Sequence, residues 1–163
     1  MRKAILTSLA IGATMLLAVE AHAQAGPPAY GETISAETAK KAATAAIAES
    51  RKNGWGMCVA VTAPSGDLVY FERMDNCQYA STAISIHKAK AAATFRRPTK
   101  AFEDRIATGG PAGMAVVTLD GVIASEGGIP IVIGGKIVGA IGCSGATGQQ
   151  DGVACQAGVD AVK

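Results

Sequence analysis

The chain has 163 residues and a formal net charge of only +2 at pH 7, and its hydrophobic content of 49% includes just 4% aromatic residues. This length fits one domain with a core of its own. The small net charge argues against nucleic acid as a partner, because proteins that bind it carry a strongly basic face. Alanine, glycine, valine and isoleucine dominate, so we expect a core that depends on the close approach of backbones.

The N-terminus has the pattern of a secretory signal peptide. A basic start is followed by an apolar stretch at residues 5–19 and by Ala21-His22-Ala23, which has the small-x-small form of a cleavage site. We expect cleavage before Gln24, with cleavage after Ala25 as the alternative. The other interpretation of this segment is an uncleaved N-terminal anchor.

Removal of the signal peptide at residues 1–23 leaves residues 24–163, which we expect to form a single domain in the periplasm or outside the cell. A membrane-spanning helix needs about 20 consecutive apolar residues. No stretch after Gln24 offers that, so the domain is not expected to be embedded in a membrane.

The first part of this domain predicts a helix followed by a hairpin. Residues 24–31 should form an extended lead-in. A helix is expected at 36–52, because Ser35 is a good N-cap residue and Asn53-Gly54 suits the left-handed end of a helix. Two strands, at residues 57–63 and 68–73, flank a turn of Pro-Ser-Gly-Asp.

The middle of the chain predicts two helices and a strand. A helix at 81–95 should stop before Pro98, because the residue before a proline disfavours helix. A short helix is expected from Thr99 to about residue 106. Gly109-Gly110-Pro111 should break it, and residues 114–119 are predicted as a short strand.

The last third predicts a hairpin, a loop and a helix. Strands at 129–133 and 136–141 flank Gly134-Gly135, a dipeptide suited to the positive φ angles of a tight turn. A glycine-rich loop follows, and Asp151 is expected to cap the final helix. The loop has two interpretations: its backbone N–H groups hold an anion, or it only connects the strand to the helix.

Hairpin connections therefore dominate the predicted order of helix, two strands, two helices, three strands and helix. This order indicates an α+β domain with a mostly antiparallel sheet and helices on its faces.

All four cysteines, Cys58, Cys77, Cys143 and Cys155, follow the signal peptide. An oxidising compartment permits disulfides, and four cysteines permit three complete pairings. No two of them have the spacing of metal ligands, and there is no CxxCH sequence for covalent attachment of haem. We expect one structural disulfide, with the remaining cysteines buried as small apolar side chains.

His87 is the one histidine that remains after removal of the signal peptide. It lies on the predicted helix 81–95, where a helical repeat places Ile84, His87 and Ala91 on a common face. Histidine is a common axial ligand of haem iron. The alternative is a surface or partly buried histidine that binds nothing.

Three stretches resemble one protein family. They are the segment LVYFERMDNC at 68–77, the segment KAKAAATFRRPT at 88–99, and the terminal GGIPIVIGGKIVGAIGCSGATGQQDGVACQAGVDAV at 127–162. In order and spacing they are similar to the GlcG/HbpS-like proteins, which also occur as the C-terminal domain of PduO-type proteins. The resemblance implies a profilin-like α/β/α sandwich with a five-stranded antiparallel sheet, assembly into homo-oligomers, and binding of haem or a related tetrapyrrole.

The resemblance also points to candidate cofactor-binding residues. Lys88 begins the second motif and can pair with a haem propionate or another carboxylate. The alternative for Lys88 is an intramolecular ion pair with Glu72 or Asp75. His87 is the candidate ligand of the metal on the chemistry of its imidazole, and not from the resemblance.

The remaining candidates lie on the loop that follows the first hairpin. Arg73 and Asp75 can pair across the turn. Met74 is either a thioether ligand or a packing residue. Tyr79 is placed to face a ligand.

The signal-like N-terminus and the family resemblance together imply an exported haem-binding protein that acts as a carrier, a buffer or an accessory in redox or iron sensing. One alternative is an enzyme that degrades haem or performs a small-molecule redox step. Another is a non-catalytic, partner-binding subunit of a periplasmic system, whose partner would be a periplasmic or membrane sensor. The sequence assigns no catalytic residue: there is no GxSxG elbow, no HExxH motif and no carboxylate cluster.

Overall fold

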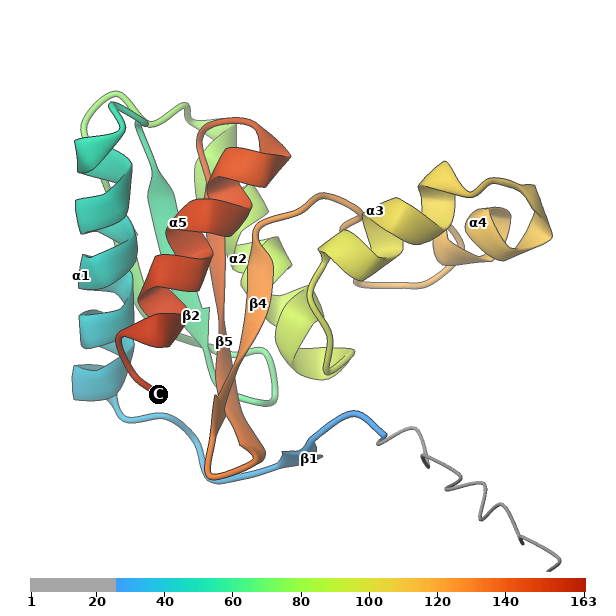
Figure 1. Cartoon of the computed structure of the whole chain (residues 1–163), viewed down its shortest axis with the longest axis horizontal. Coiled ribbons are helices and arrows are strands. Elements are labelled where there is room, and N and C mark those ends of the chain that lie inside the picture. Colours follow the sequence, from blue (N-terminus) through green and yellow to red (C-terminus); the bar gives the residue numbers. More distant parts are fainter. Residues whose placement is uncertain (1–25) are drawn as a thin grey trace, which may run out of the picture.

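The computed structural model describes residues 26–163, and the predicted signal peptide lies outside the residues it describes. A five-stranded sheet stands between two layers of helices (Figure 1). Helices α1 (Ala36–Lys52) and α5 (Gly148–Asp160) pack side by side on one face of the sheet, and α2 (Ala80–Thr94) covers the other. The fold is therefore the α+β class that was predicted, a profilin-like α/β/α sandwich.

The sheet is built around β5 (Lys136–Ser144). One edge of β5 pairs with β4 (Gly128–Ile133), and the other pairs with β2 (Cys58–Thr62), which in turn pairs with β3 (Leu68–Arg73). These three pairings are antiparallel. Gly134 and Gly135 join β4 to β5 with φ angles of +57° and +75°, which confirms the predicted tight turn.

The predicted strand at residues 114–119 is wrong. Residues 110–116 form a short helix, α4 (Gly110–Val116), with Pro111 in its first turn, where proline is well tolerated. The fifth strand is instead β1 (Ala29–Tyr30), part of the predicted extended lead-in, which pairs in parallel with the start of β5. A short apolar run forms a strand only when a sheet edge is within reach, and residues 114–119 project away from the sheet (Figure 1).

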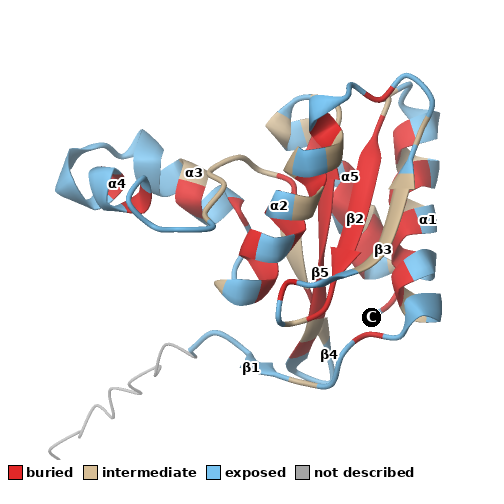
Figure 2. Cartoon of the chain, turned by 180° about the vertical axis from the view of Figure 1, so that it is seen from behind, coloured by how far each residue is buried: buried red, intermediate tan, exposed pale blue. Residues whose placement is uncertain are grey.

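Helix α4 and the preceding α3 (Lys100–Ala107) form an arm that projects from the side of the sandwich (Figure 1). We call residues 100–122 the α3–α4 arm. Its two helices pack mainly against each other. Most of its surface is exposed, in contrast to the sheet behind it (Figure 2).

Capping explains where α1 and α5 begin. Ser35 accepts a hydrogen bond from the backbone N–H of Thr38, which confirms the predicted N-cap of α1. The predicted cap of α5 is wrong: Thr147, not Asp151, is its N-cap, and a capping box links Thr147 to Gln150. Asp151 lies one turn inside the helix, where it is buried.

Small residues let the layers pack closely, as the composition predicts. Four alanines of α1 and all of β2 are buried (Figure 2). The backbone of α2 lies directly on β5, because a Cβ atom at Gly142 would overlap the carbonyl oxygen of Ser85 and lie only 2.5 Å from the backbone nitrogen of Ala89. Dispersion forces between the layers therefore depend on the absence of a side chain at residue 142.

Across residues 26–163, no helix is long and apolar enough to span a membrane.

We predict that Gly142→Ala destabilises the protein by about 1–3 kcal/mol, because the new methyl group forces α2 away from β5. The matched control is Gly148→Ala at the start of α5, where a Cβ atom would make only ordinary contacts at 3.6 Å. Urea denaturation followed by circular dichroism measures both variants. Equal midpoints for Gly142→Ala and the wild type would contradict this account of the packing.

Candidate functional site

The six residues predicted as a cofactor site do not form one cluster in the fold. Arg73 is the last residue of β3, and Met74, Asp75 and Tyr79 belong to the loop between β3 and α2. Lys88 points into the interior from α2, and the adjacent His87 lies on the exposed side of the same helix.

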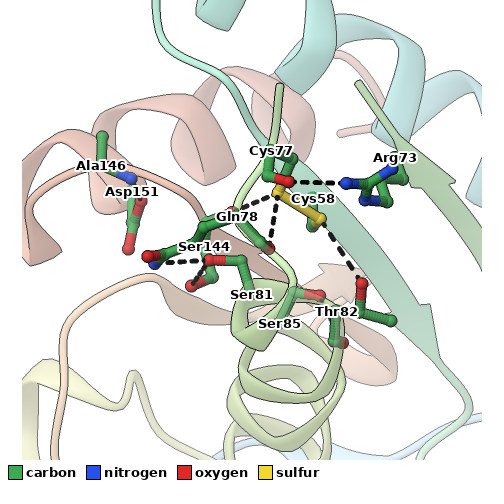
Figure 3. Close-up of a disulfide and its surroundings, with 10 residues drawn as sticks. All are labelled: Cys58, Arg73, Cys77, Gln78, Ser81, Thr82, Ser85, Ser144, Ala146 and Asp151. Atoms are coloured by element: carbon green, nitrogen blue, oxygen red, sulfur yellow. Dashed lines mark hydrogen bonds between the residues drawn. A yellow bond between two sulfur atoms is a disulfide. The ribbon is translucent and has the colours of Figure 1, made fainter. Parts of the chain in front are cut away.

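The loop after β3 brings Arg73 and Tyr79 together. Nη2 of Arg73 donates a hydrogen bond of 2.7 Å to the carbonyl oxygen of Cys77 (Figure 3). Its guanidinium also lies over the ring of Tyr79, 5.4 Å from the ring centroid. The predicted pairing of Arg73 with Asp75 is not among the ion pairs of residues 26–163.

Met74 and Asp75 face another direction. They line a hollow of about 260 Å³ together with Trp55 and Arg51. Met74 is half-buried and packs against the hydrophobic core, as does Trp55. This contact supports packing, the second of the two interpretations of Met74.

A buried ion pair accounts for Lys88. Its Nζ lies 2.8 Å from Oδ2 of Asp151 and donates a second hydrogen bond of 2.6 Å to the carbonyl oxygen of Glu126. The two charged side chains are only 1% and 3% exposed. The intramolecular ion pair is therefore confirmed, but its partner is Asp151 and not Glu72 or Asp75.

Two opposing effects act on the carboxyl of Asp151. Burial raises the pKa of Asp151 above its ordinary value, while the ammonium of Lys88 and the backbone N–H of Ala146 oppose that rise. The N–H of Ala146 donates to Oδ1 at 3.0 Å. Both carboxylate oxygens are thus occupied, so Asp151 anchors the fold at this point.

The same contacts decide between the two interpretations of the glycine-rich loop. The N–H of Ala146 is taken by Asp151, and the N–H of Thr147 donates to the side chain of Gln150. In return the N–H of Gln150 donates to the hydroxyl of Thr147. Since the loop satisfies these donors internally, it acts as a connection between β5 and α5.

Thr99 extends this network to the root of the α3–α4 arm. Its hydroxyl donates to the carbonyl oxygen of Ser125 at 2.6 Å and accepts the N–H of Gly128 at 2.9 Å. The carboxylate of Glu103 accepts the N–H of Glu126 at 2.7 Å. The segment that returns from the arm is therefore held on one side by Thr99 and Glu103 and on the other by Lys88.

Two disulfides are present where one was predicted. Cys58 is joined to Cys77, with their Cα atoms 6.1 Å apart, and Cys143 is joined to Cys155, with their Cα atoms 5.7 Å apart. The first bond ties the loop after β3 to strand β2 (Figure 3), and the second ties α5 to β5. The prediction was wrong in leaving two cysteines unpaired, because pairing depends on which strands and helices the fold makes adjacent.

His87 lies at a hollow of about 370 Å³ that α2 forms with the last residues of the α3–α4 arm. The other lining residues are Lys90, Asp120, Gly121 and Val122. The imidazole is exposed, and it makes no side-chain hydrogen bond within the part of the chain that the structure describes. Its nitrogen atoms are free to meet a ligand.

Residues 26–163 contain no group of three or more histidine, cysteine, aspartate or glutamate side chains that could hold a metal ion.

A second hollow, also of about 370 Å³, was missed by the sequence analysis. It lies between α3 and α4, with Arg97 and Arg105 among its lining residues and Phe102, Val116 and Leu119 as apolar walls. The sequence shows both arginines. The hollow between α3 and α4 was not predicted, because residues 114–119 were expected to join the sheet as a strand.

We predict that Lys88→Met destabilises the protein by about 3–5 kcal/mol, because it leaves the carboxylate of Asp151 buried without a counterion. The double variant Lys88→Met with Asp151→Leu should recover much of that loss, since it removes the unpaired charge. The control is Lys100→Met, which breaks the exposed ion pair with Asp104 and should have far less effect. Denaturant titration measures all three, and a Lys88→Met midpoint equal to that of the control would refute the assigned role.

We also predict that peptide mapping without reduction recovers the Cys58–Cys77 and Cys143–Cys155 pairs. Because each bond restricts the unfolded chain, replacing either pair by serine should cost about 2–4 kcal/mol of stability. Mass spectrometry of the non-reduced digest provides the check. Any other pairing would contradict the arrangement of β2, β5 and α5.

Known proteins resemble this chain in sequence. The family described as "Haem degrading protein HbpS-like" matches residues 34–160. Protein GlcG of Escherichia coli K12 is 38% identical over 111 residues, which cover 68% of this chain and 81% of GlcG. An uncharacterised 15.0 kDa protein of Citrobacter freundii, from the dhaT-dhaS intergenic region, is 30% identical over 129 residues, 78% of this chain and 91% of that protein.

Solved structures share the fold. The crystal structure of HbpS has a TM-score of 0.74 and 27% identity, and the match covers 86% of this chain and 98% of HbpS. A double mutant of Streptomyces reticuli HbpS has a TM-score of 0.74 and 26% identity, and its match covers 94% of this chain and 99% of that one. PduOC, solved as a haem complex, has a TM-score of 0.73 at 20% identity, over 80% of this chain and 96% of PduOC. The match over most of the described residues, in sequence and in fold, shows that the chain belongs to the HbpS-like family.

Proposed function

We propose that this protein binds haem and that His87 supplies an axial ligand to the iron. The family description names haem, and PduOC has been solved as a haem complex. The observation that carries the proposal is the imidazole of His87, which is exposed at a hollow and free of side-chain hydrogen bonds within residues 26–163. Neutral imidazole is a common ligand of haem iron.

The hollow fits haem in its donor atoms and only partly in its shape. Lys90 lies beside His87 and offers an ammonium to a propionate. Val122 is the one apolar side chain among the lining residues, whereas a bound cofactor needs most of its apolar surface covered. A second copy of the chain would supply the missing cover, so the proposal includes a homo-oligomer.

The proposed place of action is outside the cytoplasm. Two disulfides support it, because such bonds persist in oxidising compartments. The signal-like N-terminus supports it independently. In the periplasm or outside the cell, a haem-binding protein acts as a carrier, as a buffer, or as an accessory to a sensor of iron or redox state.

We propose binding without turnover. Around His87 the hollow offers one ammonium and one carboxylate, from Lys90 and Asp120, and no further histidine. Haem breakdown is the alternative that the family description suggests. It predicts that the haem absorption disappears when a reductant is added in the presence of catalase, whereas simple binding predicts that the absorption persists.

The proposal predicts that haemin added to the purified protein gives a Soret band that saturates at low micromolar concentration. His87→Ala should shift the band and weaken binding at least tenfold, because the iron loses its protein ligand. The control is Lys41→Ala, an exposed residue of α1 on the opposite face of the sheet. No saturable binding below high micromolar haemin would rule out haem binding, and an unchanged band in His87→Ala would rule out His87 as the ligand.

A further inference from the structure

The groove between α3 and α4 combines an apolar floor with two cationic groups. Phe102, Ala112, Val116 and Leu119 form much of the floor, and Arg97 and Arg105 complete the lining. Phe102 and Val116 are buried, at 4% and 6% exposure, so the floor is fixed by packing. The volume of about 370 Å³ matches a small organic molecule.

The two arginines are not neutralised by the protein. Neither belongs to an ion pair among residues 26–163. The acidic side chains of α3 contact other groups: Asp104 pairs with Lys100 at 2.6 Å, and the carboxylate of Glu103, which keeps its charge, accepts the N–H of Glu126 at 2.7 Å. The groove therefore carries two positive charges that a ligand can complement.

Local contacts hold Arg97 in position. Its Nε donates to the carbonyl oxygen of Phe95 at 3.1 Å, and its guanidinium lies over the ring of Phe102, 5.8 Å from the centroid. The edge of Phe95 in turn packs on Phe102, with ring centroids 5.2 Å apart. Since Nε is engaged, the terminal nitrogens of Arg97 remain for a ligand. A side chain already ordered loses less entropy on binding.

We infer that this groove binds a small apolar carboxylate, with the carboxylate bound by Arg97 and Arg105 and the apolar body against Phe102, Val116 and Leu119. Guanidinium groups bind carboxylates through paired, charge-assisted hydrogen bonds. Two sources share this chemistry: a free fatty acid, and the propionate-bearing edge of a tetrapyrrole. The site is distinct from the His87 hollow and does not require that His87 bind haem.

The test uses decanoate as the charged probe and decanol as its uncharged match, each titrated into the full chain by isothermal calorimetry. We expect decanoate to bind at least tenfold more tightly than decanol. Arg97→Gln and Arg105→Gln should each weaken decanoate binding by about tenfold, because each removes a charge-assisted contact. Arg51→Gln, an exposed arginine outside the groove, is the control and should change nothing.

A second variant tests the floor without altering charge. Ala112→Phe fills the groove from α4 and should abolish decanoate binding while both arginines remain. Equal affinity for decanoate and decanol, or equal losses in Arg51→Gln and the groove variants, would overturn the inference. The inference would also be overturned if the arginine variants altered the oligomeric state in sedimentation while the affinity for decanoate stayed unchanged. The groove would then be a contact between copies of the chain.

Competition identifies the source of the carboxylate. In the wild type and in His87→Ala, haemin that displaces decanoate indicates the edge of a tetrapyrrole. Decanoate that remains bound beside haemin indicates a separate acid. Both results support the groove as a carboxylate site. If decanoate does not bind the groove, the haemin test of His87 is unaffected, so the two proposals fail separately.

Discussion

The ion pair between Lys88 and Asp151 is the contact on which the assembly of the layers depends. Lys88 belongs to α2 and Asp151 to α5, and these helices lie on opposite faces of the sheet. The two charges meet next to Gly127, where a Cβ atom would lie 2.7 Å from Cβ of Asp151 and 3.0 Å from Nζ of Lys88. A buried pair of this kind is costly to break, because a single charge left in the interior has no water to solvate it.

This contact also explains why the chain returns from the arm where it does. Lys88 binds the carbonyl oxygen of Glu126, and Thr99 and Glu103 bind the same segment from the side of α3. The root of the α3–α4 arm is therefore fixed, while the rest of the arm stands clear of the sandwich. Two hollows border the arm: the His87 hollow lies between α2 and residues 120–122, and the arginine groove lies between α3 and α4.

Two disulfide bonds add covalent links to this ion pair. The Cys58–Cys77 bond holds the loop from Met74 to Tyr79 against β2, and the Cys143–Cys155 bond holds α5 on β5. Arg73 adds a hydrogen bond to the backbone of Cys77. The loop that sequence motifs marked as a candidate site is thus firmly positioned, although its side chains do not converge with Lys88.

Local patterns in the sequence determined most of the elements. Ser35 caps α1 because its hydroxyl needs only a nearby N–H, and Gly134-Gly135 turns the β4–β5 hairpin because glycine accepts positive φ without strain. Both effects act within a few residues, so they can be predicted without a fold. The helical placement of His87 and Lys88 on adjacent positions is local in the same sense.

Only the tertiary structure decided which distant residues meet. Aspartate is a residue type common at helix N-caps, yet Asp151 is buried and forms an ion pair with a lysine 63 positions away. Residues 114–119 have the apolar content of a strand, yet no sheet edge reaches them and α4 forms instead. The pairing of the four cysteines and the placement of Arg97 and Arg105 at one groove depend likewise on long-range packing, which no local pattern encodes.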